Sequence, residues 1–192
     1  VLTTPMIGNY GVNEEDAESS RPQVAGLIVK EYCDQPSNWR ATSTLAKYLK
    51  KHRVMAADQM PTREIVRHIR ETGAKPAILA VGEVDRVALS RRAAELAEMT
   101  GRNLISKVTC SAPYVVSPQK DVTPKFFIVA YDFGIKQNMV RELVARGCRV
   151  EVVPATTSAE KILEKNPDGI LLSNGPGDPK MCTATIANIK KA

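Results

Sequence analysis

The chain has 192 residues and a net charge of +6, with 43% hydrophobic and 25% charged residues. This balance is typical of a globular protein with one large domain or two small ones, and it excludes collagen-like and low-complexity chains. The basic residues are spread out and lack aromatic stacking motifs, so we expect no nucleic-acid partner. No apolar run reaches the length of a membrane span and no signal peptide is recognisable, so we expect no membrane partner and a cytoplasmic location.

The sulfur and imidazole side chains are too scattered to predict a metal site. The cysteines form no CxxC pair, and the chain has two histidines, His52 and His68, both on basic segments where we expect them to be solvated. We expect reduced thiols, and inert packing for Cys148 at the start of a strand and Cys182 in the first turn of a helix.

The first half of the chain mixes short strand-like and helical patterns. GLIVKEY (26–32) and PAILAVG (76–82) are rich in aliphatic residues and read as strands. Three helices are predicted. The first spans 43–52 and is capped by Thr42 or Ser43, and the second spans 61–73, with Pro61 in its first turn and Gly73 as its stop. The third runs from its cap Asp85 to Met99 and ends at Gly101, with four residues facing inward: Leu89, Ala93, Leu96 and Ala97. These elements predict an α/β domain over residues 1–112.

A proline-rich strip separates the two halves. SAPYVVSPQKDVTPK (111–125) holds three prolines and no helical pattern. Prolines favour extended, semi-rigid connections, so we predict an interdomain linker over 113–125.

The second half, 126–192, reads as alternating strands and helices. Strands are predicted at 126–132, 148–154 and 168–174. A helix is predicted at 136–147, with Met139, Val140, Leu143 and Val144 inward. Thr157 and Glu160 predict a capping box for a short helix that Pro167 prevents from continuing, and Ile186 and Ile189 mark the next helix. The order β-α-β-α-β predicts a parallel sheet with right-handed crossovers.

Ligands of such sheets bind beyond the carboxyl ends of the strands, where two loops follow. In DFGIKQN (132–138), we expect Asp132 to cap the next helix and Gly134 to make the turn. The letters DFG also occur in kinases, but no HRD loop or glycine-rich loop accompanies them here, so we exclude a kinase.

The loop NGPGDP (174–179) is the better candidate for a binding site. Gly175 and Gly177 can expose backbone N–H groups to a developing oxyanion, on a path stiffened by two prolines. A phosphate site and a plain tight turn capped by Asp178 remain alternatives. A reacting group is missing, because neither G-x-S-x-G nor G-x-C-x-G occurs.

Four stretches resemble one known family. They are IGNYGVNEEDAESSRPQVAGLIVKEY, TREIVRHIRETGA, VAYDFGIKQNMVRELVARGCRVEVVPA and DGILLSNGPGDP. They are similar to the small, glutamine-using subunit of bacterial carbamoyl phosphate synthetase. The resemblance implies an N-terminal domain specific to that subunit, followed by the first part of a flavodoxin-like class I glutamine amidotransferase domain.

The same resemblance implies a function and its partners. Gly175 and Gly177 would contact L-glutamine, and ammonia would pass to the large subunit, where bicarbonate and ATP yield carbamoyl phosphate for arginine and pyrimidines. ATP and magnesium sites would lie on the large subunit, so no cofactor is expected in this chain.

The sequence also departs from the family. The family's G-x-C-x-G-x-Q elbow and its His and Glu would follow Ala192, and a β-rich stretch would precede Val1, so the chain resembles an internal portion with no catalytic residue. Pro61 stands before Thr62 and Arg63, where the family usually has an acidic residue. Two alternatives remain: a docking module for the large subunit, and a domain that binds a phosphorylated small molecule.

Overall fold

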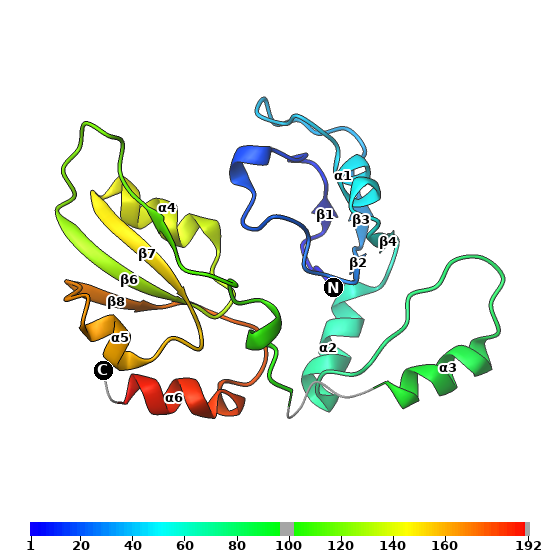
Figure 1. Ribbon diagram of the computed structural model, residues 1–192. Helices are drawn as coiled ribbons and strands as arrows, with labels where there is room; N and C mark the ends of the chain where they lie inside the picture. The colour runs from blue at the N-terminus through cyan, green and yellow to red at the C-terminus, as the bar shows by residue number, and fades with distance from the viewer. Residues whose placement is uncertain (97–101, 191–192) are drawn as a thin grey trace. The chain divides into compact units, whose positions relative to one another are not determined.

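The computed structural model describes residues 1–96 and 102–190, and the chain folds into two compact units, Val1–Met99 and Thr100–Ala192. Both units combine helices with strands, which confirms the predicted α/β class (Figure 1).

The first unit is built from very short strands and three helices. Its elements are β1 (Met6–Ile7), a 3₁₀ turn η1 (Glu14–Asp16), β2 (Gly26–Ile28), β3 (Glu31–Tyr32), α1 (Leu45–Lys51), β4 (Met55–Ala57), α2 (Thr62–Thr72) and α3 (Arg86–Glu95).

The run GLIVKEY forms two strands where the sequence predicts one. β2 pairs in parallel with β4, whereas β3 pairs in parallel with β1, so the chain changes partner at Val29 and Lys30. Val29 is buried, and its N–H still donates to Ala57 O at 2.9 Å. A run of β-forming residues therefore does not fix where one strand ends.

The run PAILAVG, predicted as a strand, has no regular secondary structure. Its Leu79 side chain instead packs against the backbone of Gly26, 3.1 Å from where a Cβ would stand. Val81 is 80% exposed. Strand propensity reflects fit to a half-buried pleated surface, and this segment has no such surface beside it.

The helix ends differ from the predictions in detail. Thr44 caps α1 by accepting from Lys47 N, in place of Thr42 or Ser43. α2 stops at Gly73 as predicted, with Pro61 at its cap position. Asp85 caps α3 as predicted, accepting from Val87 N and Ala88 N.

The prediction that α3 continues beyond residue 95 is wrong at Leu96. The helix ends at Glu95, and Leu96 is exposed where we predicted it inside. Ala97, Met99 and Gly101 lie outside the described residues.

The second unit contains a four-stranded sheet and carries the candidate site. Its elements are η2 (Ile105–Lys107), β5 (Tyr114–Val116), β6 (Phe126–Asp132), α4 (Gln137–Ala145), β7 (Cys148–Pro154), α5 (Ala159–Leu163), β8 (Gly169–Leu172), η3 (Pro179–Met181) and α6 (Thr183–Ile189).

The sheet has the order β5-β7-β6-β8, with β7, β6 and β8 parallel and β5 antiparallel. The three parallel strands and the helices between them follow the predicted β-α-β-α-β order. Within the segment 113–125, which we predicted as an interdomain linker, β5 pairs with β7 at the sheet edge inside the second unit.

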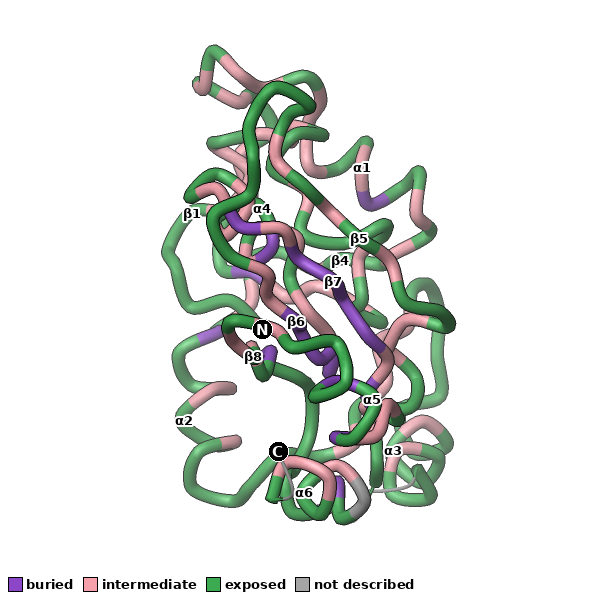
Figure 2. The backbone as a smooth tube through the Cα atoms, turned by 60° about the vertical axis from the view of Figure 1, so that its left-hand side comes forward, coloured by how far each residue is buried: buried purple, intermediate pink, exposed green. Residues whose placement is uncertain are grey.

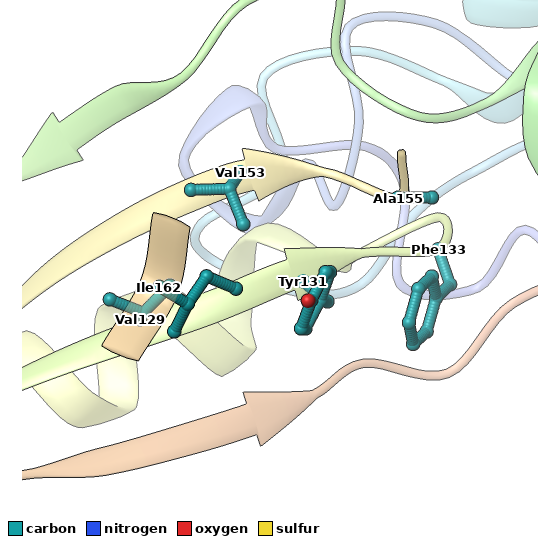
Figure 3. Packing of buried hydrophobic residues seen from close by; sticks show 6 residues of the cluster. All are labelled: Val129, Tyr131, Phe133, Val153, Ala155 and Ile162. Atoms are coloured by element: carbon teal, nitrogen blue, oxygen red, sulfur yellow. The ribbon is translucent and has the colours of Figure 1, made fainter. Parts of the chain in front are cut away.

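The sheet buries both faces of its central strands, so buried residues follow β6 and β7 (Figure 2). On one face, Val129 and Tyr131 of β6 pack with Val153 of β7 and Ile162 of α5 (Figure 3). The half-buried Ile189 of α6 packs against this cluster. The other face packs against α4 through residues that include Val140, Leu143 and Val144, as predicted.

Residues near α5 correct one cap prediction and confirm one helix. Ser158 caps α5 by accepting from Lys161 N, so the predicted Thr157–Glu160 capping box is wrong. α6 forms where Ile186 and Ile189 predicted a helix.

Candidate functional site

The two glycine loops meet at the carboxyl ends of β6 and β8. These strands pair in register up to Tyr131 and Leu172, so the loops that follow them start side by side. A Cβ on Gly175 would stand 2.3 Å from Phe133 O, closer than real Cβ atoms approach a carbonyl. Glycine at 175 is therefore required for the contact between the loops.

Ser173 joins the loops by hydrogen bonds, a role that the sequence did not indicate. The residue is buried, and its Oγ accepts from Phe133 N at 3.0 Å and donates to Asn174 O at 2.9 Å. The sequence separation of 40 between Ser173 and Phe133 explains why no local pattern marks this pair.

Asp132 organises the loop after β6 in a way that differs from the prediction. Its Oδ1 accepts from Gly134 N at 2.9 Å and Ile135 N at 2.8 Å, so it closes the turn, while α4 begins later with Lys136 at its cap position. Its Oδ2 accepts from Cys110 N at 2.8 Å. Gly134 has φ +118°, so it makes the turn as predicted.

Residues 102–110 form a third part of the site, although we predicted them as the end of the first domain. The segment crosses all three parallel strand ends: Leu104 lies 3.6 Å from the Cβ position of Gly177, Thr109 Oγ1 accepts from Ala155 N at 2.9 Å, and Cys110 contacts Asp132. No motif or periodicity in the sequence marks this crossing.

The two candidate glycines have different local constraints. Gly177 has φ +85°, a left-handed conformation that favours glycine, and only ordinary contacts surround its Cβ position. Among the described residues, neither the Gly175 nor the Gly177 N–H donates to a protein acceptor. Both residues are exposed, so these N–H groups are available to a ligand. Asp178 accepts from Lys180 N and caps η3, as the tight-turn alternative requires.

A cavity of about 410 Å³ borders the NGPG loop. Phe133, Ile105 and Ile186 line it together with other mainly apolar residues. Apolar walls offer no hydrogen-bond partners to a ligand with a polar amide group. A ligand of that kind in this cavity would depend on the backbone groups at its rim for hydrogen bonds.

The other candidate residues lie outside this arrangement or are packed. Cys148 and Cys182 are buried, as predicted, while the ring of His52 lies 4.6 Å from that of Tyr48 and is half-buried, contrary to the expected solvation. His68 is exposed. The described residues bring together no group of three metal ligands, and none of their helices is long and apolar enough to cross a membrane.

Cys110 is the strongly perturbed titratable group of the site. Burial, and then the nearby Asp132 carboxylate, raise the pKa of its thiol from 9.0 to about 11. The folded state keeps the proton over a range in which the unfolded chain loses it, so the free energy of unfolding should fall as pH rises from 9.0 to about 11.

We expect Cys110→Ala to reduce that decline. Burial also raises the pKa values of Tyr114 and Tyr131, so part of the decline should remain in the variant. The measurement is the urea midpoint at several pH values in this range for the parent, Cys110→Ala and, as a matched control, Cys33→Ala. Equal pH slopes for the parent and Cys110→Ala would contradict the role given to this thiol.

Two family models match the chain. Residues 1–79 match the carbamoyl-phosphate synthase small chain, CPSase domain, and residues 129–192 match glutamine amidotransferase class-I. The second match includes both glycine loops.

Curated relatives match along nearly the whole chain. The carbamoyl phosphate synthase small chain of Syntrophotalea carbinolica is 46% identical over 200 residues, covering 99% of this chain and 53% of the relative. Those of Nostoc sp. and Escherichia coli K12 are 43% and 40% identical over 202 and 203 residues, covering 99% of this chain and 52% and 53% of the relatives. The chain spans about half the length of these relatives, and it belongs to the carbamoyl phosphate synthase small-chain family.

Proposed function

We propose that the chain is part of a glutamine-hydrolysing small chain of carbamoyl phosphate synthase, in which Gly175 and Gly177 contact L-glutamine. The observation that carries this proposal is a pair of exposed glycines whose N–H groups donate to no described protein acceptor, in the loop that follows the carboxyl end of a parallel strand. Ligands of open α/β sheets bind at this edge.

These N–H groups suit the chemistry of amide hydrolysis. Attack on a side-chain amide places negative charge on its oxygen, and donors that are already oriented stabilise that charge without reorganising. The close packing of Gly175 against Phe133 provides such a fixed orientation.

The remaining assignments follow from the family. We propose that ammonia passes to a large subunit that holds ATP, magnesium and bicarbonate. The carbamoyl phosphate made there would serve arginine and pyrimidine synthesis in the cytoplasm. We also propose that this chain itself binds no cofactor. We also propose that the first domain ends at residue 112. The family models leave residues 80–128 unmatched and so give no boundary there, while packing divides the chain after Met99.

We further propose that a polypeptide of these 192 residues alone does not hydrolyse glutamine. It contains no G-x-C-x-G elbow, and oxyanion donors without a nucleophile retain only a small residual of catalysis. The test measures ammonia released from L-glutamine by this polypeptide and by a small chain of the relatives' full length that includes it.

We expect release only from the longer chain. Ammonia above a protein-free blank from the 192 residues would refute the missing-nucleophile proposal. A longer chain that binds the large subunit and releases no ammonia would refute glutamine hydrolysis in favour of the docking function.

A further inference from the structure

Ser173 holds the peptide group that carries one of the two candidate donors. Its hydroxyl donates to Asn174 O at 2.9 Å. That carbonyl and the N–H of Gly175 belong to the same peptide group. In a planar trans peptide the C=O and the N–H point in opposite directions, so fixing one fixes the other. The N–H of Gly175 is therefore directed away from the Ser173 hydroxyl.

The hydroxyl is itself held in place by a second bond. Its oxygen accepts from Phe133 N at 3.0 Å, so one buried Oγ both accepts and donates. A hydroxyl can do both at once, and the pair of bonds fixes the side-chain torsion.

The neighbouring donors are already occupied. Asp132 accepts hydrogen bonds from the N–H groups of Gly134 and Ile135, and Ser173 accepts one from the N–H of Phe133. Three consecutive N–H groups of this loop thus have protein acceptors, whereas the facing Gly175 N–H has none among the described residues. Asp132 and Ser173 thus occupy the donors of the loop after β6, while the Gly175 N–H in the loop after β8 stays available to a ligand.

We propose that Ser173 is a positioning residue that sets the direction of the Gly175 N–H. Its purpose in catalysis rests on the proposed function, because that N–H would then donate to the oxyanion formed from the glutamine amide. Ser173 acts through the peptide and does not touch the substrate.

The kinetic test uses Ser173→Ala in a small chain of the relatives' full length, assembled with the large subunit. Removing one oxyanion donor lowers kcat about 100- to 1000-fold, so misdirecting it should lower kcat for glutamine hydrolysis by roughly 10- to 100-fold. KM should change by less than about threefold, because the donor acts mainly in the transition state. Ser173→Thr keeps the hydroxyl and should recover most of kcat.

Ser158→Ala is the matched control, because it also removes a hydroxyl that accepts a backbone hydrogen bond, at the start of α5. It should leave kcat within about twofold while costing stability as an N-cap substitution does. A merely structural role for Ser173 would give both alanine variants the same kinetics, and that result would overturn the proposal.

A second measurement does not depend on activity. In proton–nitrogen NMR spectra of the 192 residues, Ser173→Ala should shift the Gly175 amide signal and speed hydrogen exchange at Phe133 N, and Ser158→Ala should do neither. An unchanged Gly175 signal would overturn the positioning role, whether or not glutamine is hydrolysed. A shifted signal together with an inactive full-length parent would overturn the proposed function and leave the positioning role standing.

Discussion

Asp132→Ala is expected to lower the free energy of unfolding of the second unit more than any other single polar substitution at the site. The side chain is buried and accepts from three backbone N–H groups, those of Gly134, Ile135 and Cys110. Each buried donor left without a partner costs about 1–3 kcal/mol, so for three donors we expect a total loss of about 3–9 kcal/mol. That is a large part of the stability of a typical domain.

Asp132→Asn separates the charge from the hydrogen bonds. The amide oxygen can still accept from Gly134 N and Ile135 N, but its NH₂ group then faces the N–H of Cys110, which loses its acceptor. We therefore expect a smaller loss, about 2 kcal/mol. Asp178→Ala is the matched control, because this exposed carboxylate accepts from Lys180 N alone, and its loss should cost about 1 kcal/mol.

Urea unfolding followed by far-ultraviolet circular dichroism would measure these differences. Tryptophan fluorescence is unsuitable, because the one tryptophan, Trp39, is 91% exposed and belongs to the first unit. If Asp132→Ala and Asp178→Ala lowered the midpoint equally, the three hydrogen bonds of Asp132 would not stabilise the loop as argued.

The sheet of the second unit was predictable because its signals are local. FFIVAYD is a continuous apolar run, as expected of a strand covered on both faces, and CRVEVVP is a second β-forming run; they became β6 and β7 with the predicted bounds. The helix between them has its apolar residues at helical spacing and is followed by Gly147 at φ +84°.

The first unit was less predictable because its strands span two or three residues each. Short strands depend on partners distant in the sequence, so GLIVKEY divides between β1 and β4 as partners, and PAILAVG pairs with none among the described residues. Caps shifted by one or two positions for a related reason: Thr42, Ser43 and Thr44 can all cap, and the surrounding fold selects Thr44.

At the candidate site, the sequence indicated the glycines but not what holds them. The hydrogen bonds of Ser173 to Phe133, Thr109 to Ala155 and Asp132 to Cys110 span 40, 46 and 22 residues. Only the folded chain brings such pairs together, so a motif shows which loop is unusual without showing which side chains shape it.

Gly175→Ala is the second substitution with a large expected effect. Its Cβ would stand 2.3 Å from Phe133 O and 3.0 Å from Phe133 Cβ. The carbonyl is backbone that cannot rotate away, because the adjoining turn is held by Asp132 and Ser173. Overpacking of this kind costs about 1–3 kcal/mol, and the rigid turn places the expected value near 3 kcal/mol.

Gly177→Ala is the matched comparison within the same loop. Its backbone N–H stays, and its added Cβ meets nothing closer than 3.6 Å, so the cost is that of a left-handed φ, about 1 kcal/mol. Gly82→Ala supplies the same conformational cost in the first unit, where φ is +92° and nothing lies within 4 Å of the Cβ position.

The two glycines should therefore separate in both stability and activity. Urea unfolding should give Gly175→Ala a free energy of unfolding about 2 kcal/mol lower than that of Gly177→Ala, because only the Gly175 substitution pushes the two loops apart. In a full-length small chain, Gly175→Ala should also lose glutamine hydrolysis by displacing its own N–H. Equal stabilities would mean that the loop yields easily, and such a loop could not hold an N–H group fixed for an oxyanion.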